Sequence, residues 1–165
     1  MTAKDNAAIA KERPGDTDAI RALLVAAFGG QAEAGLVDAL RADGDLALSL
    51  VALTDGAVIG HVAVSPMTGA SCALAPLAVA PPWQGQGVGA ALVRAALVGA
   101  AEAGFGAVFV LGDPAYYSRF GFSAAAAAPF RSPYAGPYFM ALALRDGGLS
   151  GGGPVAHARA FSSLA

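Results

Sequence analysis

Three glycines alternate with other residues in the stretch Gln84-Gly85-Gln86-Gly87-Val88-Gly89-Ala90. A strand-like apolar run precedes this stretch and a helix-like run follows it. Glycine lets backbone N–H groups approach a ligand closely, and the first turn of a helix offers unpaired donors at the positive end of its dipole. The stretch therefore predicts a backbone cradle for a pyrophosphate, which needs no lysine. The structural alternative is a glycine-rich helix start that merely packs tightly.

Two other nucleotide-binding motifs compete for these residues. Gly85-x-Gly87-x-x-Ala90 formally fits a dinucleotide fingerprint. However, residues 81–84 separate it from the preceding strand. The carboxylates nearest to the expected ribose position, about 20 residues on, are Glu102, which lies within the predicted helix, and Asp113, so neither is well placed. The phosphate loop of nucleoside triphosphatases is excluded because the sequence contains no Gly-Lys-Ser or Gly-Lys-Thr. A nicotinamide-dependent oxidoreductase therefore remains only a weak rival.

A second motif lies downstream, Leu111-Gly112-Asp113-Pro114-Ala115-Tyr116-Tyr117-Ser118-Arg119-Phe120-Gly121-Phe122. Together the two motifs resemble the GNAT superfamily of N-acetyltransferases, and especially its YhbS-like branch. The cofactor motif of that family runs Gln or Arg, x, x, Gly, x, Gly or Ala, and residues 84–89 match it at every position. The resemblance covers roughly residues 9–144 in the order of their elements.

This resemblance implies a site for acetyl-CoA as acyl donor, with strand backbone groups along the pantetheine arm and the glycine loop around the pyrophosphate. The residues implied are Leu77, Ala78, Val79, Gln84, Gly85, Gln86, Gly87, Val88, Gly89 and Ala90. It also implies that Tyr117 protonates the departing CoA thiolate, while Tyr116 packs. Attack of an amine on a thioester expels a thiolate, which an acid within hydrogen-bond reach stabilises. For Tyr117, a buried packing residue is the structural alternative.

The group that takes the proton of the acceptor amine is harder to identify. Many family members carry an acid on the strand before the loop, but residues 72–79 contain none. His61 is the first candidate because imidazole titrates near neutral pH. The two-residue period of a strand places it on one face with Ile59 and Ala63, where a lone histidine more often has a structural role.

Other polar residues are weaker candidates for this step. Glu33 and Asp38 lie on the second predicted helix, where this family often lines the acceptor site. His157 is predicted to be solvated. Because the two histidines are isolated from each other in the sequence, we expect no metal site.

Composition excludes several classes of protein. The net charge is -2 and lysine occurs only at positions 4 and 11, so no broad basic face for nucleic acid is expected. The single cysteine, Cys72, allows no intrachain disulfide and is predicted to be a small buried hydrophobe. Residues 88–112 are long enough to cross a bilayer, but Arg94 opposes insertion, so a helix and a buried strand are preferred. We expect a cytoplasmic protein without a membrane partner.

Hydrophobic periodicity gives the order of the elements. It predicts a strand at 9–14, a helix that is capped by Asp16 or Thr17 and reaches Phe28, and a second helix at 32–42. Strands follow at 46–53 and 57–64, paired through Thr54-Asp55-Gly56. A strand at 73–79 contains Pro76, which belongs at an edge, a bulge or a place where strands part. A helix at 88–103, a strand at 107–111, a two-turn helix from Asp113-Pro114, and strands at 137–144 and 155–161 complete the chain.

The expected fold is α/β and GNAT-like, with a mixed, mainly antiparallel sheet splayed at the cofactor strand and helices on both faces. Residues 1–146 would form the acyltransferase domain, and 147–165 a glycine-rich linker and C-terminal extension packed on it. The predicted activity is transfer of an acetyl group from acetyl-CoA to a primary amine by direct attack. A non-catalytic acyl-CoA-binding or regulatory module is the alternative. The acceptor would be a small-molecule, peptide or protein amine, and a homodimer is one expected assembly.

Overall fold

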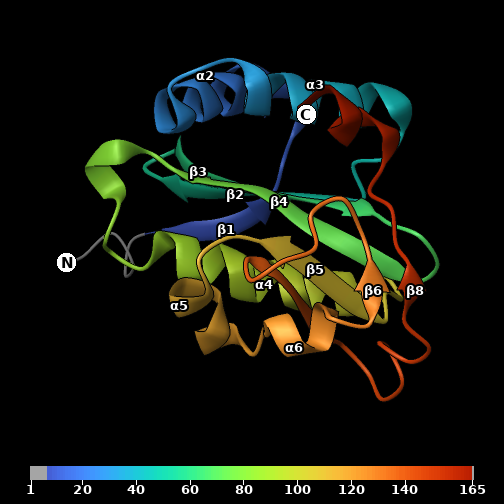
Figure 1. Cartoon of the computed structure of the whole chain (residues 1–165). Helices are drawn as coiled ribbons and strands as arrows, with labels where there is room; N and C mark the ends of the chain where they lie inside the picture. Colours follow the sequence, from blue (N-terminus) through green and yellow to red (C-terminus); the bar gives the residue numbers. More distant parts are fainter. Residues whose placement is uncertain (1–6, 165) are drawn as a thin grey trace.

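Six strands form one sheet in the order β1-β2-β3-β4-β5-β7 (Figure 1). The computed structural model describes residues 7–164. All neighbouring strands are antiparallel except β4 and β5, which are parallel. The predicted mixed, mainly antiparallel α/β fold is therefore confirmed. The strands are β1 (Ala8–Lys11), β2 (Leu48–Thr54), β3 (Ala57–Pro66), β4 (Ser71–Val79), β5 (Ala107–Leu111) and β7 (Phe139–Ala143).

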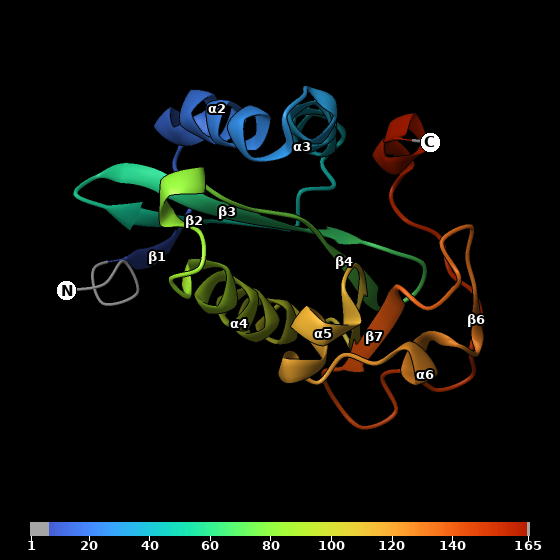
Figure 2. The same ribbon diagram turned by 60° about the vertical axis from the view of Figure 1, so that its left-hand side comes forward.

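Helices cover both faces of this sheet (Figure 2). On one face, α2 (Thr17–Phe28) and α3 (Ala32–Asp43) follow the short 3-10 turn η1 (Pro14–Asp16). On the other face, α4 (Val88–Glu102) packs against β2, β3 and β4. The glycines after α2 and α3, Gly29 and Gly44, adopt left-handed φ values of 75° and 78°. Helices commonly end in this way because glycine has no Cβ to clash.

The predicted β2–β3 hairpin is confirmed, but a bulge changes which residues share a face. Asp55 and Gly56 both have positive φ, as a tight hairpin turn requires. The register shifts between Ala52 and Leu53. Consequently Ile59 packs in the cluster around α4, whereas Ala63 packs in the cluster around α2. The expectation that the two share a face is wrong, because the bulge inserts an extra residue and resets the alternation.

The sheet splays where the sequence places Pro76. Ser71–Ala73 of β4 pair with residues 107–109 of β5, and no pairing between the two strands follows within the described residues. The pairing of β4 with β3 continues to Val79 after an irregularity between Val62 and Val64. One edge of residues 77–79 therefore faces away from any strand, and the predicted splay is confirmed.

The remaining elements are short. The 3-10 turn η2 (Pro81–Trp83) precedes α4. The others follow β5 and are α5 (Pro114–Tyr117), η3 (Ser118–Phe120), α6 (Ala124–Ala127), β6 (Phe130–Arg131), β8 (Gly153–Pro154) and η4 (Arg159–Leu164). The predicted terminal strand at 155–161 is wrong. Only β8 pairs, with β6, and η4 packs on α3, where Ala160 and Phe161 are buried beside Leu36 and Leu40.

The glycines between β7 and β8 allow close backbone packing. A Cβ on Gly148 would lie 1.9 Å from the carbonyl oxygen of Gly106, and one on Gly152 would lie 2.6 Å from that of Pro129. Gly153 also donates its N–H to the Pro129 oxygen at 3.1 Å. Residues 147–153 are thus folded onto the domain and carry the C-terminal segment back to α3.

Candidate active site

The glycine loop lines a cleft of about 450 Å³, here called the loop cleft. Of the predicted cofactor residues, Ala78 and Gln86 do not line it. Ala78 is buried on the α2 side of the sheet, and Gln86 donates its side-chain amide to the Pro82 oxygen. The lining residues are Leu77, Val79, Trp83, Gln84, Gly85, Gly87, Val88, Gly89, Ala90, Tyr116 and Arg119.

The backbone of this loop is shaped to expose its donors. Gly85 and Gly87 have φ values of 76° and 87°, a region that residues with a Cβ rarely adopt. Gly87 is the N-cap of α4, and no side chain caps the helix. The Gln84 side chain donates to the Val79 oxygen at 3.0 Å and ties the loop to β4. The N–H groups of the first turn of α4 are left for an anionic ligand.

Two consecutive tyrosines follow β5 on α5. The Asp113 side chain accepts a hydrogen bond from the Ala115 N–H at 3.0 Å, with Pro114 in the first turn. This cap starts a short helix that turns Tyr116 towards the loop cleft. The Tyr116 hydroxyl lies over α4, since a Cβ on Gly89 would come within 2.8 Å of it. The glycine pattern therefore also makes room for this hydroxyl.

Tyr117 points into a second cleft. Its ring packs on Gly112, where a Cβ would lie 2.6 Å from the ring, and meets the ring of Phe122 edge-on. Burial, with a smaller contribution from Tyr116, raises the pKa of the Tyr117 phenol to about 12. The hydroxyl is therefore protonated at neutral pH.

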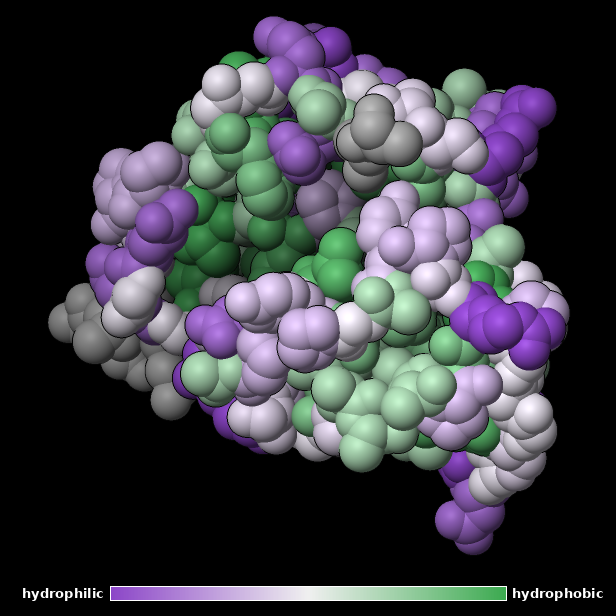
Figure 3. Space-filling model, in the orientation of Figure 1, coloured by the Kyte–Doolittle hydropathy of each residue, from purple (hydrophilic) through white to green (hydrophobic). Residues whose placement is uncertain are grey.

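This second cleft, here called the sheet cleft, has a volume of about 480 Å³. In Figure 3 a hollow with hydrophobic residues on its floor opens beneath the layer of α2 and α3. It is assembled from the α2–α3 junction, the splayed strands, α5 and the C-terminal segment. Its lining residues are Phe28, Ala32, Glu33, Leu36, Ala73, Leu74, Ala75, Pro76, Leu77, Phe109, Val110, Leu111, Tyr117, Tyr134, His157 and Phe161.

The two clefts adjoin at the splayed strand. Leu77 lines both of them, and the neighbouring residues Tyr116 and Tyr117 each line one. A long ligand in the loop cleft can therefore present one end to a second ligand in the sheet cleft. The arrangement suits a reaction between two molecules bound at the same time.

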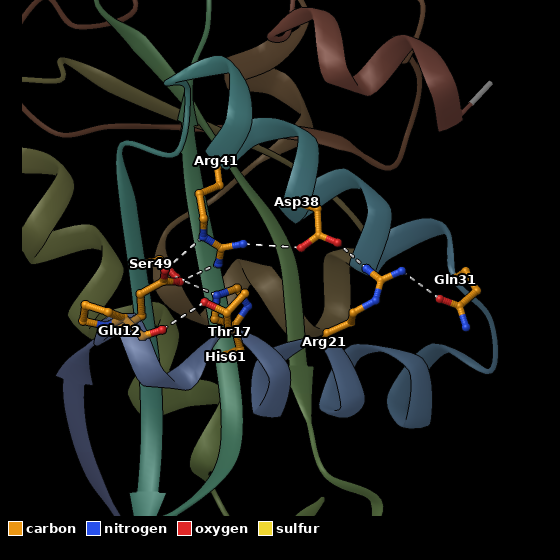
Figure 4. A network of polar contacts seen from close by, with 9 residues as sticks. Glu12, Thr17, Arg21, Gln31, Asp38, Arg41, Ser49 and His61 are labelled. Atoms are coloured by element: carbon orange, nitrogen blue, oxygen red, sulfur yellow. Dashed lines mark hydrogen bonds and ion pairs between the residues drawn. The ribbon is translucent and has the colours of Figure 1, made fainter.

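His61 lies in neither cleft. It is fully buried on β3, and its Nε2 lies 2.8 Å from the Ser49 hydroxyl (Figure 4). Ser49 gives its own proton to Glu12, so Nε2 of His61 must be the donor, and its buried Nδ1 has no partner among the described residues. Burial lowers the pKa of His61 to about 4, although the Glu12 carboxylate opposes this. This placement lends no support to His61 as a proton acceptor.

The polar side chains beyond His61 form ion pairs around α3 (Figure 4). Arg41 binds the Glu12 carboxylate at 2.9 Å and Asp38 at 3.4 Å, and Arg21 pairs with Asp38. Burial raises the pKa of Glu12, but hydrogen bonds from Arg41 and Ser49 outweigh it and hold this pKa below its usual value. Asp38, a weaker candidate for the proton acceptor, is engaged here and does not line the sheet cleft.

Three residues in the clefts were missed or misread from the sequence. Arg119 lines the loop cleft, where it adds a cation. Its guanidinium lies 4.2 Å from the centre of the Tyr116 ring. Tyr134 and His157 line the sheet cleft, so the prediction that His157 is solvated is wrong. Its ring is half-buried because the C-terminal segment folds back against α3. Only the arginine within the second motif offered a sequence signal.

The buried cysteine is inert. Cys72 donates weakly to the Ala107 oxygen at 3.6 Å, and burial raises the pKa of its thiol to about 12. The predicted small buried hydrophobe is confirmed. Across residues 7–164, no three His, Cys, Asp or Glu side chains gather as a potential metal site. In the same part of the chain, no helix has the length and apolar character needed to cross a bilayer.

Comparison with known proteins gives consistent matches. A sequence model of the Acetyltransferase (GNAT) family matches residues 17–122. YhbS of Escherichia coli strain K12, an uncharacterized N-acetyltransferase, is 45% identical over 148 residues, which cover 85% of this chain and 89% of that protein.

Two solved structures are also similar. The crystal structure of GNAT family YhbS from Escherichia coli in complex with CoA has a TM-score of 0.89 at 43% identity, covering 95% of this chain and 92% of that one. A GNAT family acetyltransferase from Brucella melitensis, solved in complex with acetyl-CoA, has a TM-score of 0.81 at 39% identity. That match covers 94% of this chain and 97% of the other.

Proposed function

The chain belongs to the GNAT family of acetyltransferases, and we propose that it transfers an acetyl group from acetyl-CoA to a primary amine by direct attack. The observation that carries this proposal is the meeting of two clefts at Leu77, with Tyr116 in one and Tyr117 in the other. A donor in the loop cleft and an amine in the sheet cleft would bring their reacting atoms together there. The buried, protonated Cys72 is not a candidate for a covalent intermediate.

The loop cleft fits acetyl-CoA in its geometry. Uncapped N–H groups at the start of α4 would bind the pyrophosphate, with the Arg119 guanidinium adding a positive charge. The open edge of residues 77–79 offers backbone groups to an extended pantetheine arm, as an added strand would use them. The similar proteins solved with CoA and with acetyl-CoA support this choice of donor.

Tyr117 is the residue that we assign to the leaving group. The amine nitrogen bonds to the thioester carbonyl carbon, the C–S bond breaks, and the thiolate takes the phenol proton. A pKa near 12 keeps the Tyr117 proton in place until the thiolate forms.

A cytoplasmic location belongs to the same proposal, since the only cysteine is unpaired and disulfides are rare in that compartment.

The test is a screen of primary amines with acetyl-CoA, in which the release of free CoA thiol is measured. The panel should contain small aliphatic and aromatic amines, peptides with free N-termini, and peptides with internal lysines. We expect CoA to raise the melting temperature, because a ligand that binds the folded state stabilises it, and NADH to leave it unchanged. Binding of CoA without turnover of any amine would favour the non-catalytic module. Saturable NADH binding without CoA binding would favour an oxidoreductase.

A further inference from the structure

The sheet cleft contains few side chains that can exchange a proton. Among its lining residues, the ionisable ones are Glu33, Tyr117, Tyr134 and His157. Carboxylate and imidazole are the side chains that commonly accept protons, which leaves Glu33 and His157 as acceptors. Glu33 lies in the first turn of α3 and lines the cleft with an acidic side chain. It is suited to attracting an ammonium group, whereas imidazole is the side chain that best exchanges protons near neutral pH.

The backbone around His157 is anchored on both sides. Before it, Ala156 donates its N–H to the Thr68 hydroxyl at 2.9 Å and accepts from the Thr68 N–H at 3.1 Å. After it, Arg159 forms an ion pair with Asp43 at 2.7 Å, and Phe161 is buried against α3. The segment is thus held between the β3–β4 turn and α3, which fixes the place of the imidazole on the cleft wall.

Three aromatic rings hold the imidazole itself. The rings of Phe161, Tyr134 and Phe139 lie with their centres 4.7, 5.0 and 6.4 Å from that of His157. No residue of the described range 7–164 hydrogen-bonds its ring nitrogens, so they are available to a ligand. The partial exposure of His157 lets it return a proton to solvent, unlike the fully buried His61.

The surroundings keep this imidazole neutral. Burial among apolar rings lowers the pKa of His157 below its usual value. The titratable side chains that line the cleft together with His157 are Glu33 on α3, Tyr117 on α5 and Tyr134 beside the ring. Arg159, two residues along the chain, is paired with Asp43, and Asp38 and Arg41 of α3 are engaged in the ion pairs around Glu12 and Arg21. At neutral pH the imidazole therefore carries a free lone pair.

We propose that His157 is the proton acceptor for the amine, and that the acceptor is a primary amine on an apolar body, drawn in through the charge of Glu33. This inference rests on the proposed acetyltransferase function. The ammonium of the acceptor gives one proton to His157, and the free amine attacks the thioester. As the C–S bond breaks, Tyr117 protonates the sulfur, and the surplus proton on the new amide nitrogen restores the tyrosine. His157 then releases its proton to solvent.

The test compares His157→Gln with the unchanged protein, using the best acceptor from the amine screen and beginning with 2-phenylethylamine beside ethanolamine. We expect kcat at pH 7 to fall by roughly 10²- to 10⁴-fold, the usual contribution of a positioned base, with unchanged affinity for CoA. In the pH profile of kcat, the fall in rate on the acidic side, which reports protonation of His157, should disappear. Added imidazole should restore turnover in His157→Gly, which a purely structural role would not allow.

The control is Ser163→Ala, which removes a hydroxyl that donates to the Ala160 oxygen in the same segment and lines neither cleft. It should keep kcat within about twofold, since surface substitutions of this kind have small effects. A wild-type rate and pH profile in His157→Gln would overturn the assignment of the base while leaving the acetyltransferase function standing. Preference for ethanolamine over 2-phenylethylamine would overturn the apolar acceptor. If the protein without any substitution acetylates no amine in the screen, both the proposed function and this inference are overturned.

Discussion

The loop cleft and the sheet cleft share Leu77 but are built in different ways. Most of the loop cleft comes from one continuous stretch, residues 77–90, in which local backbone geometry does the binding. The sheet cleft joins side chains from residues 28 to 161, which only the folded chain brings together. A site made of adjacent backbone groups leaves a pattern in the sequence, whereas a site made of distant side chains does not.

The sharpest test of this division uses the two adjacent tyrosines. Tyr117→Phe removes the hydroxyl in the sheet cleft, and we expect turnover to fall by roughly 10²- to 10⁴-fold because the thiolate loses its acid. Tyr116→Phe removes a hydroxyl in the loop cleft and should change KM for acetyl-CoA by only about threefold, with kcat retained. Steady-state rates and a CoA titration on both variants decide this, and wild-type turnover in Tyr117→Phe would remove the acid assignment.

The next largest effect concerns the loop cleft alone. Gly87→Asp adds a negative charge and a Cβ at φ 87°, where the pyrophosphate is proposed to bind. We expect CoA affinity to fall by about 100-fold, equivalent to about 3 kcal/mol. Gly104→Asp is the matched control, because Gly104 follows the opposite end of α4 with φ 95° and open space around it. Calorimetry showing equal losses in the two variants would mean that backbone strain, and not the cleft, controls binding.

A third prediction concerns His61, which lies in neither cleft and affects stability. Its pKa is about 4 in the folded protein and near 6.5 in an unfolded chain. Between these values the unfolded state binds more protons, so stability falls as the pH drops from about 6.5 towards 4. At pH 5 the loss is about 2 kcal/mol, which lowers the melting temperature by about 4–8 °C relative to pH 7.

The comparison for this prediction is His61→Gln, which cannot titrate. Its melting temperature should change less between pH 7 and pH 5 than that of the unchanged protein. The melting temperatures of both proteins are measured by circular dichroism across this pH range. If they fall equally, His61 is not the source of the sensitivity to acid.

The smallest expected effect reaches the sheet cleft from outside. Thr68→Val removes the hydroxyl that accepts from Ala156, next to His157. One hydrogen bond contributes about 0.5–1.5 kcal/mol, so we expect KM for the acceptor to rise by about two- to tenfold without a change in CoA affinity. Thr17→Val, which removes a hydroxyl bonded to the Pro14 oxygen, is the control. A change in CoA affinity in Thr68→Val would show that the clefts are not independent.

Much of the fold could be predicted from the sequence because its signals are local. The turn at Asp55-Gly56, the glycines that end α2 and α3, and the cap at Asp113 each act on neighbouring backbone groups. The loop around Gly85 and Gly87 belongs to the same class. Such features depend on the conformations that a residue type allows, which hold in any surroundings.

What the tertiary structure decided is where distant side chains meet. One bulge in the β2–β3 hairpin moved Ile59 to the opposite face from the one predicted, and burial closed His61 away from solvent. Docking of η4 on α3 brought His157 into the sheet cleft, although the sequence predicts it to be solvated. By itself the sequence determined the donor loop, because backbone geometry is local. Packing determined the acceptor side, because burial and proximity are properties of the whole fold.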